Sequence, residues 1–167
     1  MLVEPQNPTF EAWYDSQYQS VLAAAALFCT GDHARAEDAA NDACVKAYED
    51  WDRVSQMDSP TAWATRVALN NAKRSYRRGK RRIQLLNRER LSAACTDTQR
   101  DLDLFDALGQ LSRRQRAALI LRYVEDLPQA MVADRMDVAL GTATATLTQA
   151  RSRLRAGLAE ERSEENQ

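Results

Sequence analysis

"DLPQAMVADRMDVALGTATATLTQARSRLR", residues 126–155, predicts a short helix, a tight turn and a longer amphipathic helix. Pro128 fits the first turn of a helix that runs to about Arg135, and "MDV" follows as the turn. The longer helix carries one apolar stripe in steps of three or four residues, expected to face inward: Leu140, Ala143, Leu147, Ala150, Leu154 and Leu158. This layout is that of a helix-turn-helix, although many plain three-helix bundles share it.

The remaining faces of the longer helix carry short polar and basic side chains. A helix-turn-helix presents side chains of this kind to the major groove of DNA. The candidate DNA-reading residues are Thr142, Thr144, Ala145, Thr148, Gln149, Arg151 and Arg153.

Two further helices are expected immediately upstream of this stretch. Residues 101–109 have a helical pattern, and Ser112 with Gln115 three residues later fits a capping box. The helix that the box opens has apolar residues at the spacing of a single face, namely Ala117, Ile120, Leu121 and Val124.

The N-terminal half is also predicted to be helical. A helical pattern runs from about residue 10 to Cys29, and Asp32 is expected to cap a helix at 34–50. A loop is expected at 52–58, and Ser59-Pro60 then signals a helix that extends to about Arg90.

These elements predict an all-α protein of two small helical domains, residues 1–90 and 101–167. Residues 91–100, "LSAACTDTQR", lose the helical pattern and form the expected linker, while a loop within one domain is the alternative.

Charge is divided unevenly along the chain. Formal net charges are −8 for residues 1–58, +9 for residues 59–100 and −2 for residues 101–167. The basic excess is concentrated in "RVALNNAKRSYRRGKRR" (66–82), where ten of seventeen residues are Arg, Lys or Asn. Such a footprint indicates contact with a polyanion, most simply nucleic acid, although a solvated charge run without a ligand is the plainer alternative.

Several classes of protein are not expected. Three cysteines (Cys29, Cys44, Cys95) without CxxC spacing and the single His33 argue against a zinc site or a disulfide framework. The sequence has no Gly-rich phosphate loop, HExxH or GxSxG, so neither an enzyme nor a cofactor or metal is expected. Without an apolar run near 18 residues or a signal segment, a cytoplasmic protein is expected.

Three blocks in order resemble the bacterial sigma-70 family, in its extracytoplasmic-function group. They are "AEDAANDACVKAYEDWDRV" (36–54), "SPTAWATRVALNNAKRSYRR" (59–78) and the segment 108–155, which includes "LRYVEDL" and "ARSRLR". The resemblance covers roughly residues 9–158. It implies a factor that binds core RNA polymerase through the β′ clamp helices and the β flap and directs promoter recognition and transcription initiation.

The resemblance assigns residues to three surfaces. Those expected to contact core polymerase are Glu37, Asp38, Asn41, Asp42, Val45, Tyr48 and Trp51. Those expected to recognise and melt the −10 element are Trp63, Arg66, Asn70, Lys73, Arg77 and Arg78. The helix-turn-helix residues given above would read the −35 element. An anti-sigma protein wedged between the two domains is a further partner that the family implies.

The chain departs from the family pattern at several positions. Asn41 and Cys44 replace a usual Gln and a usual large apolar residue, which is expected to shorten two polymerase contacts. Thr144 and Gln149 replace basic residues of the recognition helix, and Ala139 replaces its Ser cap. An altered −35 preference is therefore expected, with a weakened promoter reader as the alternative. The alternative function is a helix-turn-helix regulator that binds an operator and never joins the polymerase.

Overall fold

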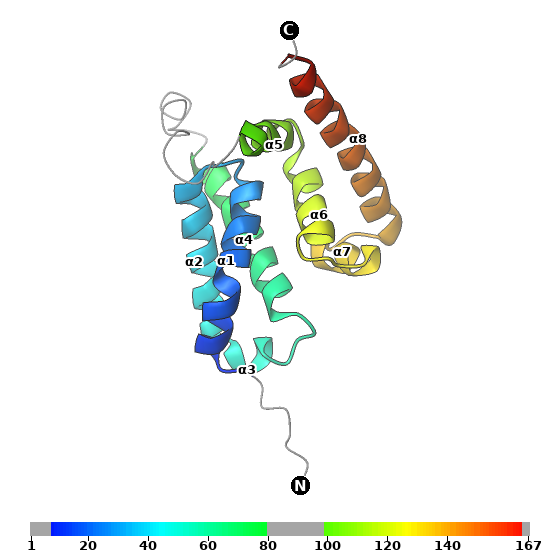
Figure 1. Cartoon of the computed structure of the whole chain (residues 1–167). Coiled ribbons are helices and arrows are strands. Elements are labelled where there is room, and N and C mark those ends of the chain that lie inside the picture. Colours follow the sequence, from blue (N-terminus) through cyan, green and yellow to red (C-terminus); the bar gives the residue numbers. More distant parts are fainter. Residues whose placement is uncertain (1–7, 80–98, 165–167) are drawn as a thin grey trace.

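The computed structural model describes residues 8–79 and 99–164, with side chains for residues 8–75 and 103–159. Within these ranges every regular element is a helix, eight in all. Figure 1 shows two helical groups, α1–α4 and α5–α8, beside one another. The prediction of an all-α chain with two helical domains is confirmed. Most of the expected linker, and the end of the helix expected to reach Arg90, lie outside the described residues.

The first group is a bundle of α1 (Phe10–Phe28), α2 (His33–Glu49) and α4 (Pro60–Gly79). Its interior is built on alanine, which lets helix axes approach closely. All of the inward positions of α2 are small and buried: Ala36, Ala39, Ala40, Ala43, Cys44 and Ala47. Larger side chains such as Val21 and Phe28 on α1 fill the space that these small residues leave.

The helix starts of this group follow local capping chemistry. Asp32 accepts a hydrogen bond from the Arg35 backbone N–H at 3.2 Å, and Ser59 Oγ accepts one from Ala62 N–H at 3.1 Å. Both predicted caps are confirmed. The loop expected at 52–58 is wrong in its first part, because α3 (Trp51–Val54) is helical and its turn carries Val54 into the interior, fully buried.

The second group contains α5 (Gln99–Gly109), α6 (Arg113–Tyr123), α7 (Gln129–Met136) and α8 (Leu140–Glu164). The predicted capping box opens α6, with Gln115 N–H donating to Ser112 Oγ at 3.2 Å and Ser112 N–H to Gln115 Oε1 at 3.1 Å. Asp137, with φ of 55°, ends α7 in the left-handed conformation and forms the tight turn before α8.

The apolar stripe of α8 is buried only in its middle. Ala143, Leu147 and Ala150 are buried, whereas Leu140 is 53% exposed, so the expectation that it faces inward is wrong. Leu140 is the first residue of α8, and side chains on a helix point back toward its N-terminus. Its side chain therefore extends past the part of α8 that packs on its neighbours.

Helix α6 packs on both groups. Ile120 belongs to the apolar cluster of α1, α2 and α4, while Leu121 belongs to that of α7 and α8. Ala62 of α4 reaches into the second cluster. The stripe predicted for α6 is therefore divided between two cores rather than forming one face, and its last member, Val124, is 44% exposed. In this structure the two groups are docked.

Candidate polymerase and nucleic-acid interfaces

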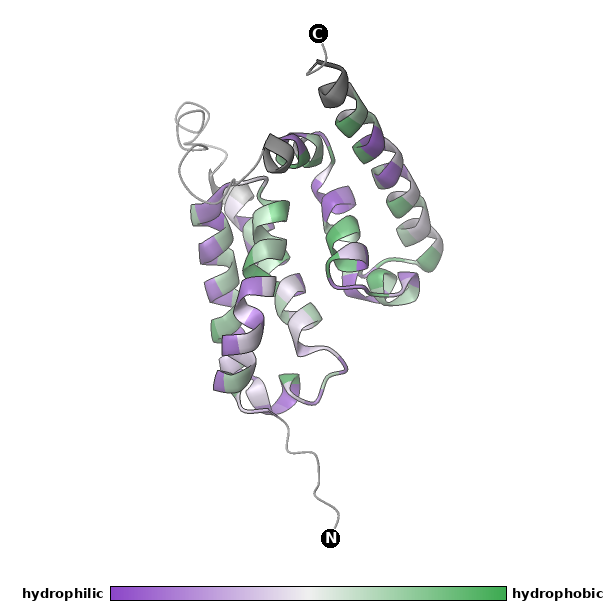
Figure 2. Ribbon diagram, viewed as in Figure 1, coloured by the Kyte–Doolittle hydropathy of each residue, from purple (hydrophilic) through white to green (hydrophobic). Residues whose placement is uncertain are grey.

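Six of the seven predicted polymerase-contact residues lie on the exposed side of α2. Glu37, Asp38, Asn41, Asp42, Val45 and Tyr48 are all exposed. Val45 is 56% exposed and Tyr48 63% exposed, which is unusual for apolar side chains on a helix whose other face is a core. Figure 2 shows hydrophilic residues along the outer edge of α2. The arrangement is an apolar centre bordered by carboxylates.

The seventh residue, Trp51, belongs mainly to an aromatic cluster that supports this side of α2. Its ring lies 5.5 Å from that of Phe10 and 5.2 Å from that of Trp13. Phe10 also meets the Tyr48 ring edge-on at 5.1 Å. The Trp51 indole N–H donates to the Pro8 carbonyl at 3.2 Å. The cluster thus holds Tyr48 in place from behind.

Cys44 is not part of the exposed side of α2. It is only 4% exposed, and burial raises the pKa of its thiol. The expectation that Cys44 shortens a polymerase contact is wrong, because its position along α2 falls with the alanines that face the core. Asn41 does lie on the exposed side, where its Oδ1 accepts a hydrogen bond from Tyr18 at 2.9 Å.

The predicted −10 residues follow one stripe of α4. Trp63 is half-buried, with the Arg53 guanidinium 5.8 Å from its ring centre, while Asn70 and Lys73 are exposed. Arg66 lies between them on the same side. Arg77 and Arg78 are also on α4, but their side chains lie outside those that the structure describes.

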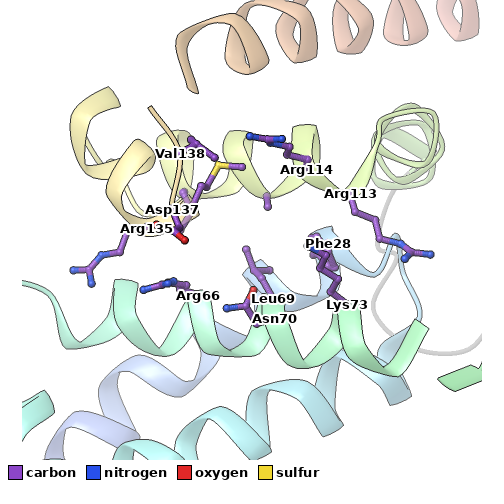
Figure 3. Close-up of a pocket in the computed structure, with 13 residues that line it drawn as sticks. Phe28, Arg66, Leu69, Asn70, Lys73, Arg113, Arg114, Arg135, Asp137 and Val138 are labelled. Atoms are coloured by element: carbon purple, nitrogen blue, oxygen red, sulfur yellow. The ribbon is translucent and has the colours of Figure 1, made fainter. Parts of the chain in front are cut away.

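Arg66, Asn70 and Lys73 of this stripe face the second helical group across a cleft of about 510 Å³. Figure 3 shows Arg66, Asn70 and Lys73 on α4 opposite residues of α6 and α7. The side chains on the far wall include Arg113, Arg114 and Arg135, which sequence reasoning had not assigned to a site. The paired arginines of "SRRQR" at the start of α6 were the available signal. We call this feature the interdomain cleft.

Arg116 ties the two groups together beside the cleft. It is only 7% exposed, and its guanidinium donates to the carbonyls of Phe28 on α1 and, at 3.2 Å, of Leu111. The same guanidinium lies 5.6 Å from the centre of the Phe28 ring. A buried cation is thus held by backbone oxygens from both groups.

A second polar contact crosses between the groups. The Thr65 hydroxyl on α4 donates to Glu125 Oε1 at 2.6 Å. Burial raises the pKa of the Glu125 carboxyl, and the hydrogen bond from Thr65 opposes that rise in part. The Glu125 carboxyl therefore binds its proton at a higher pH in this structure than a glutamate exposed to water does.

Six of the seven residues predicted on the recognition helix α8 are exposed: Thr142, Ala145, Thr148, Gln149, Arg151 and Arg153. These positions include no carboxylate and two guanidinium groups, so most of the available contacts are short and polar.

Two of the predicted residues of α8 contact neighbouring helices. Thr144 is half-buried and donates to Gln129 Oε1 of α7 at 3.1 Å. Arg153 is exposed, but its guanidinium lies 3.4 Å from Gln115 Oε1 at the start of α6. Thr144 therefore fastens α8 to α7, and Arg153 points toward α6.

The described residues contain neither a cluster of metal ligands nor a membrane-spanning helix. Among the described side chains, no three His, Cys, Asp or Glu residues lie where they could hold a metal ion. No helix in the described ranges combines the length and apolar character needed to cross a bilayer.

Comparison with known proteins identifies the two halves of the chain. Residues 15–82 match the family model "Sigma-70 region 2", and residues 101–154 match "Sigma-70, region 4". The chain is similar to the RNA polymerase sigma-E factor of Streptomyces avermitilis, at 29% identity over 142 residues, covering 82% of this chain and 78% of that protein. The protein of the same name from Streptomyces coelicolor is 27% identical, with 82% and 79% covered.

Two solved structures share the fold. One is the sigma factor RpoE in complex with the anti-sigma factor NepR from Bartonella quintana, with a TM-score of 0.74 and 24% identity, covering 90% of this chain and 96% of that chain. The other is CnrH in complex with the cytosolic domain of CnrY, with a TM-score of 0.63 and 19% identity, covering 90% and 88%.

Proposed function

Because the chain belongs to the sigma-70 family, in its extracytoplasmic-function group, we propose that it binds core RNA polymerase and directs it to promoters. The observation that carries this proposal is the presence of region 2 and region 4 in one chain, in that order. The alternative of an operator-binding regulator accounts for α7 and α8 alone and leaves region 2 without a role.

The exposed side of α2 is proposed as the surface for core polymerase, at the β′ clamp helices. Val45 and Tyr48 supply apolar area, and the carboxylates around them suit a basic partner. Aromatic side chains at the centre of an interface commonly dominate its binding energy. Tyr48, backed by the Phe10 ring, is placed to act in this way.

The α4 stripe is proposed as the surface for the −10 element. Arg66 and Lys73 would neutralise phosphates, as would Arg77 and Arg78 farther along the helix. Trp63 and Asn70 would stack on and hydrogen-bond to an unpaired base, which offsets the cost of unstacking it.

Helix α8 is proposed to read the −35 element with few charged contacts. The carboxamide of Gln149 suits adenine, and the methyl group of Thr148 suits that of thymine. The Thr148 hydroxyl already donates to the Thr144 carbonyl at 2.9 Å, which leaves its methyl group as the contact. The preference would differ from that of a recognition helix with basic residues at positions 144 and 149.

The remaining features of the proposal concern partners and chemistry. The chain would act in the cytoplasm and have no catalytic chemistry of its own. An anti-sigma protein is a proposed regulator, because the solved neighbour RpoE is in complex with the anti-sigma factor NepR. The β flap of the polymerase is the proposed partner of region 4.

The test is reconstituted transcription with purified chain, core RNA polymerase and genomic DNA fragments, followed by mapping of transcript 5′ ends. We expect initiation sites that share two upstream elements at fixed spacing. If the polymerase neither binds the chain nor gains initiation sites, the proposed function fails and the operator-binding regulator replaces it.

A matched pair of variants locates the polymerase surface. The double variant Val45→Ala/Tyr48→Ala should bind core polymerase roughly tenfold or more weakly than the wild type, since interface anchors each contribute more than about 1 kcal/mol. Gln19→Ala, on the exposed side of α1, is the control and should bind as the wild type does. Equal affinity for all three proteins would exclude the α2 surface.

A further inference from the structure

We propose that the interdomain cleft is a binding site for a small polyphosphate anion, a chain of linked phosphoryl groups either free or carried by a nucleotide. The bound anion would bridge the two domains. It would thereby hold the chain in the docked arrangement, in which the α4 stripe faces α6 and α7. The site itself is independent of the proposed function, whereas its effect on promoter binding rests on it.

The cleft is rich in positive charge. Five cations line it, two from region 2 and three from region 4: Arg66, Lys73, Arg113, Arg114 and Arg135. The described lining residues include a single carboxylate, that of Asp137. Docking therefore brings like charges from two domains to one space, where they repel each other. A polyanion between them removes that repulsion and gains contact with both sides.

Most of these cations are not neutralised by a described carboxylate. Among the described side chains, Arg66, Lys73, Arg114 and Arg135 form no ion pair with a carboxylate. A phosphate oxygen is the kind of acceptor that guanidinium groups bind most strongly.

The shape of the cleft selects the size of the anion. Its volume of about 510 Å³ lies within the range of about 300–1,000 Å³ that small-molecule sites occupy. Figure 3 shows Arg66 and Arg135 toward one end and Lys73 and Arg113 toward the other. A single phosphate would reach one end, whereas a chain of phosphoryl groups can engage both. A DNA duplex is too wide to enter.

Binding of the anion and docking of the two domains are thermodynamically linked. An anion that contacts both domains binds the docked arrangement more tightly than a separated one, so it shifts the population toward docking. Arg66, Asn70 and Lys73 would then be unavailable to promoter DNA. Under the proposed function, the anion and the −10 element compete for the same cations.

The test is isothermal titration calorimetry with sodium tripolyphosphate as the probe, in buffer of constant ionic strength without divalent cations. We expect saturable binding of one equivalent. Arg114→Gln and Arg135→Gln should each weaken it by roughly tenfold or more, because each removes a charge-assisted contact to phosphate. Arg122→Gln is the matched control, since Arg122 lies on α6 outside the cleft and pairs with Asp126. Circular dichroism verifies that each variant is folded.

The titration distinguishes a specific anion site from the absence of one. Absence of saturable binding to wild type, or equal weakening by Arg122→Gln, overturns the site. Tighter binding of ATP than of tripolyphosphate assigns the site to nucleotides, and equal binding assigns it to the phosphoryl chain alone. A larger radius of gyration at saturating tripolyphosphate, measured by small-angle X-ray scattering, refutes bridging. The titration contains neither polymerase nor DNA, so it can fail while the transcription test succeeds, and the reverse.

Discussion

Replacement of Arg116 by methionine tests whether a buried cation holds the two domains together. The guanidinium donates to the carbonyls of Phe28 and Leu111, one in each domain. Methionine keeps much of the side-chain volume but leaves both oxygens without this donor. An unsatisfied buried acceptor costs about 1–3 kcal/mol, and removal of a buried charge returns part of that through its desolvation. We expect the free energy of unfolding to fall by about 2–4 kcal/mol.

The assay is urea denaturation followed by circular dichroism at 222 nm, with the wild type and Arg122→Met measured in parallel. Arg122 is on the same helix, but its ion pair with Asp126 is at the surface, where such pairs contribute under about 1 kcal/mol. The two variants therefore differ mainly in burial. A loss below about 1 kcal/mol for Arg116→Met, or an equal loss for both variants, would refute the reasoning.

Three further predictions concern acidity, thiols and backbone strain. Burial raises the pKa of Glu125 in the folded chain. Its contribution to the free energy of unfolding is therefore present at acid pH and is lost as the pH rises through the raised pKa. Glu125→Gln should remove that pH dependence from a profile of stability against pH. Burial raises the pKa of Cys29 to about 12 and also raises that of Cys44, so in a Cys95→Ser variant a thiol-reactive dye should label nothing rapidly until denaturant is added, and rapid labelling would contradict this. Thr30 has φ of 52°, a left-handed conformation that disfavours a β-branched residue. Thr30→Gly should therefore raise the free energy of unfolding by roughly 0.5–1 kcal/mol in urea titrations. A decrease would contradict the assignment of backbone strain to Thr30.

Local chemistry explains why the helix starts could be predicted. A cap such as Asp32, Ser59 or Ser112 acts on backbone groups within three residues, so the sequence alone contains both partners. The outward side of α2 was predictable for a similar reason. Its alanines recur at the helical period, which leaves Val45 on the opposite side whatever the partner helices are. The same period would place Tyr48 beside the alanines, and only the structure shows that it is exposed.

Errors arose where a residue's surroundings come from distant segments. Cys44 was assigned to a contact surface, yet it is buried because α1 and α4 enclose that side of α2. Leu140 was expected in the core, yet it lies at the end of α8 without cover. The contact of Thr144 with DNA stays a prediction, and only the structure places Gln129 beside its hydroxyl.

The sequence by itself determined the helical elements other than α3, their capped starts, the separation of an acidic helix from a basic one, and the family. These properties depend on residue spacing and on partners a few positions apart. Tertiary structure alone decided which side chains line the interdomain cleft. Arg66 and Arg135 are far apart in the sequence but line the same cleft. It also decided that Arg116 is buried against the Phe28 carbonyl. Such juxtapositions depend on how two folded domains dock, and no period or local motif encodes that geometry.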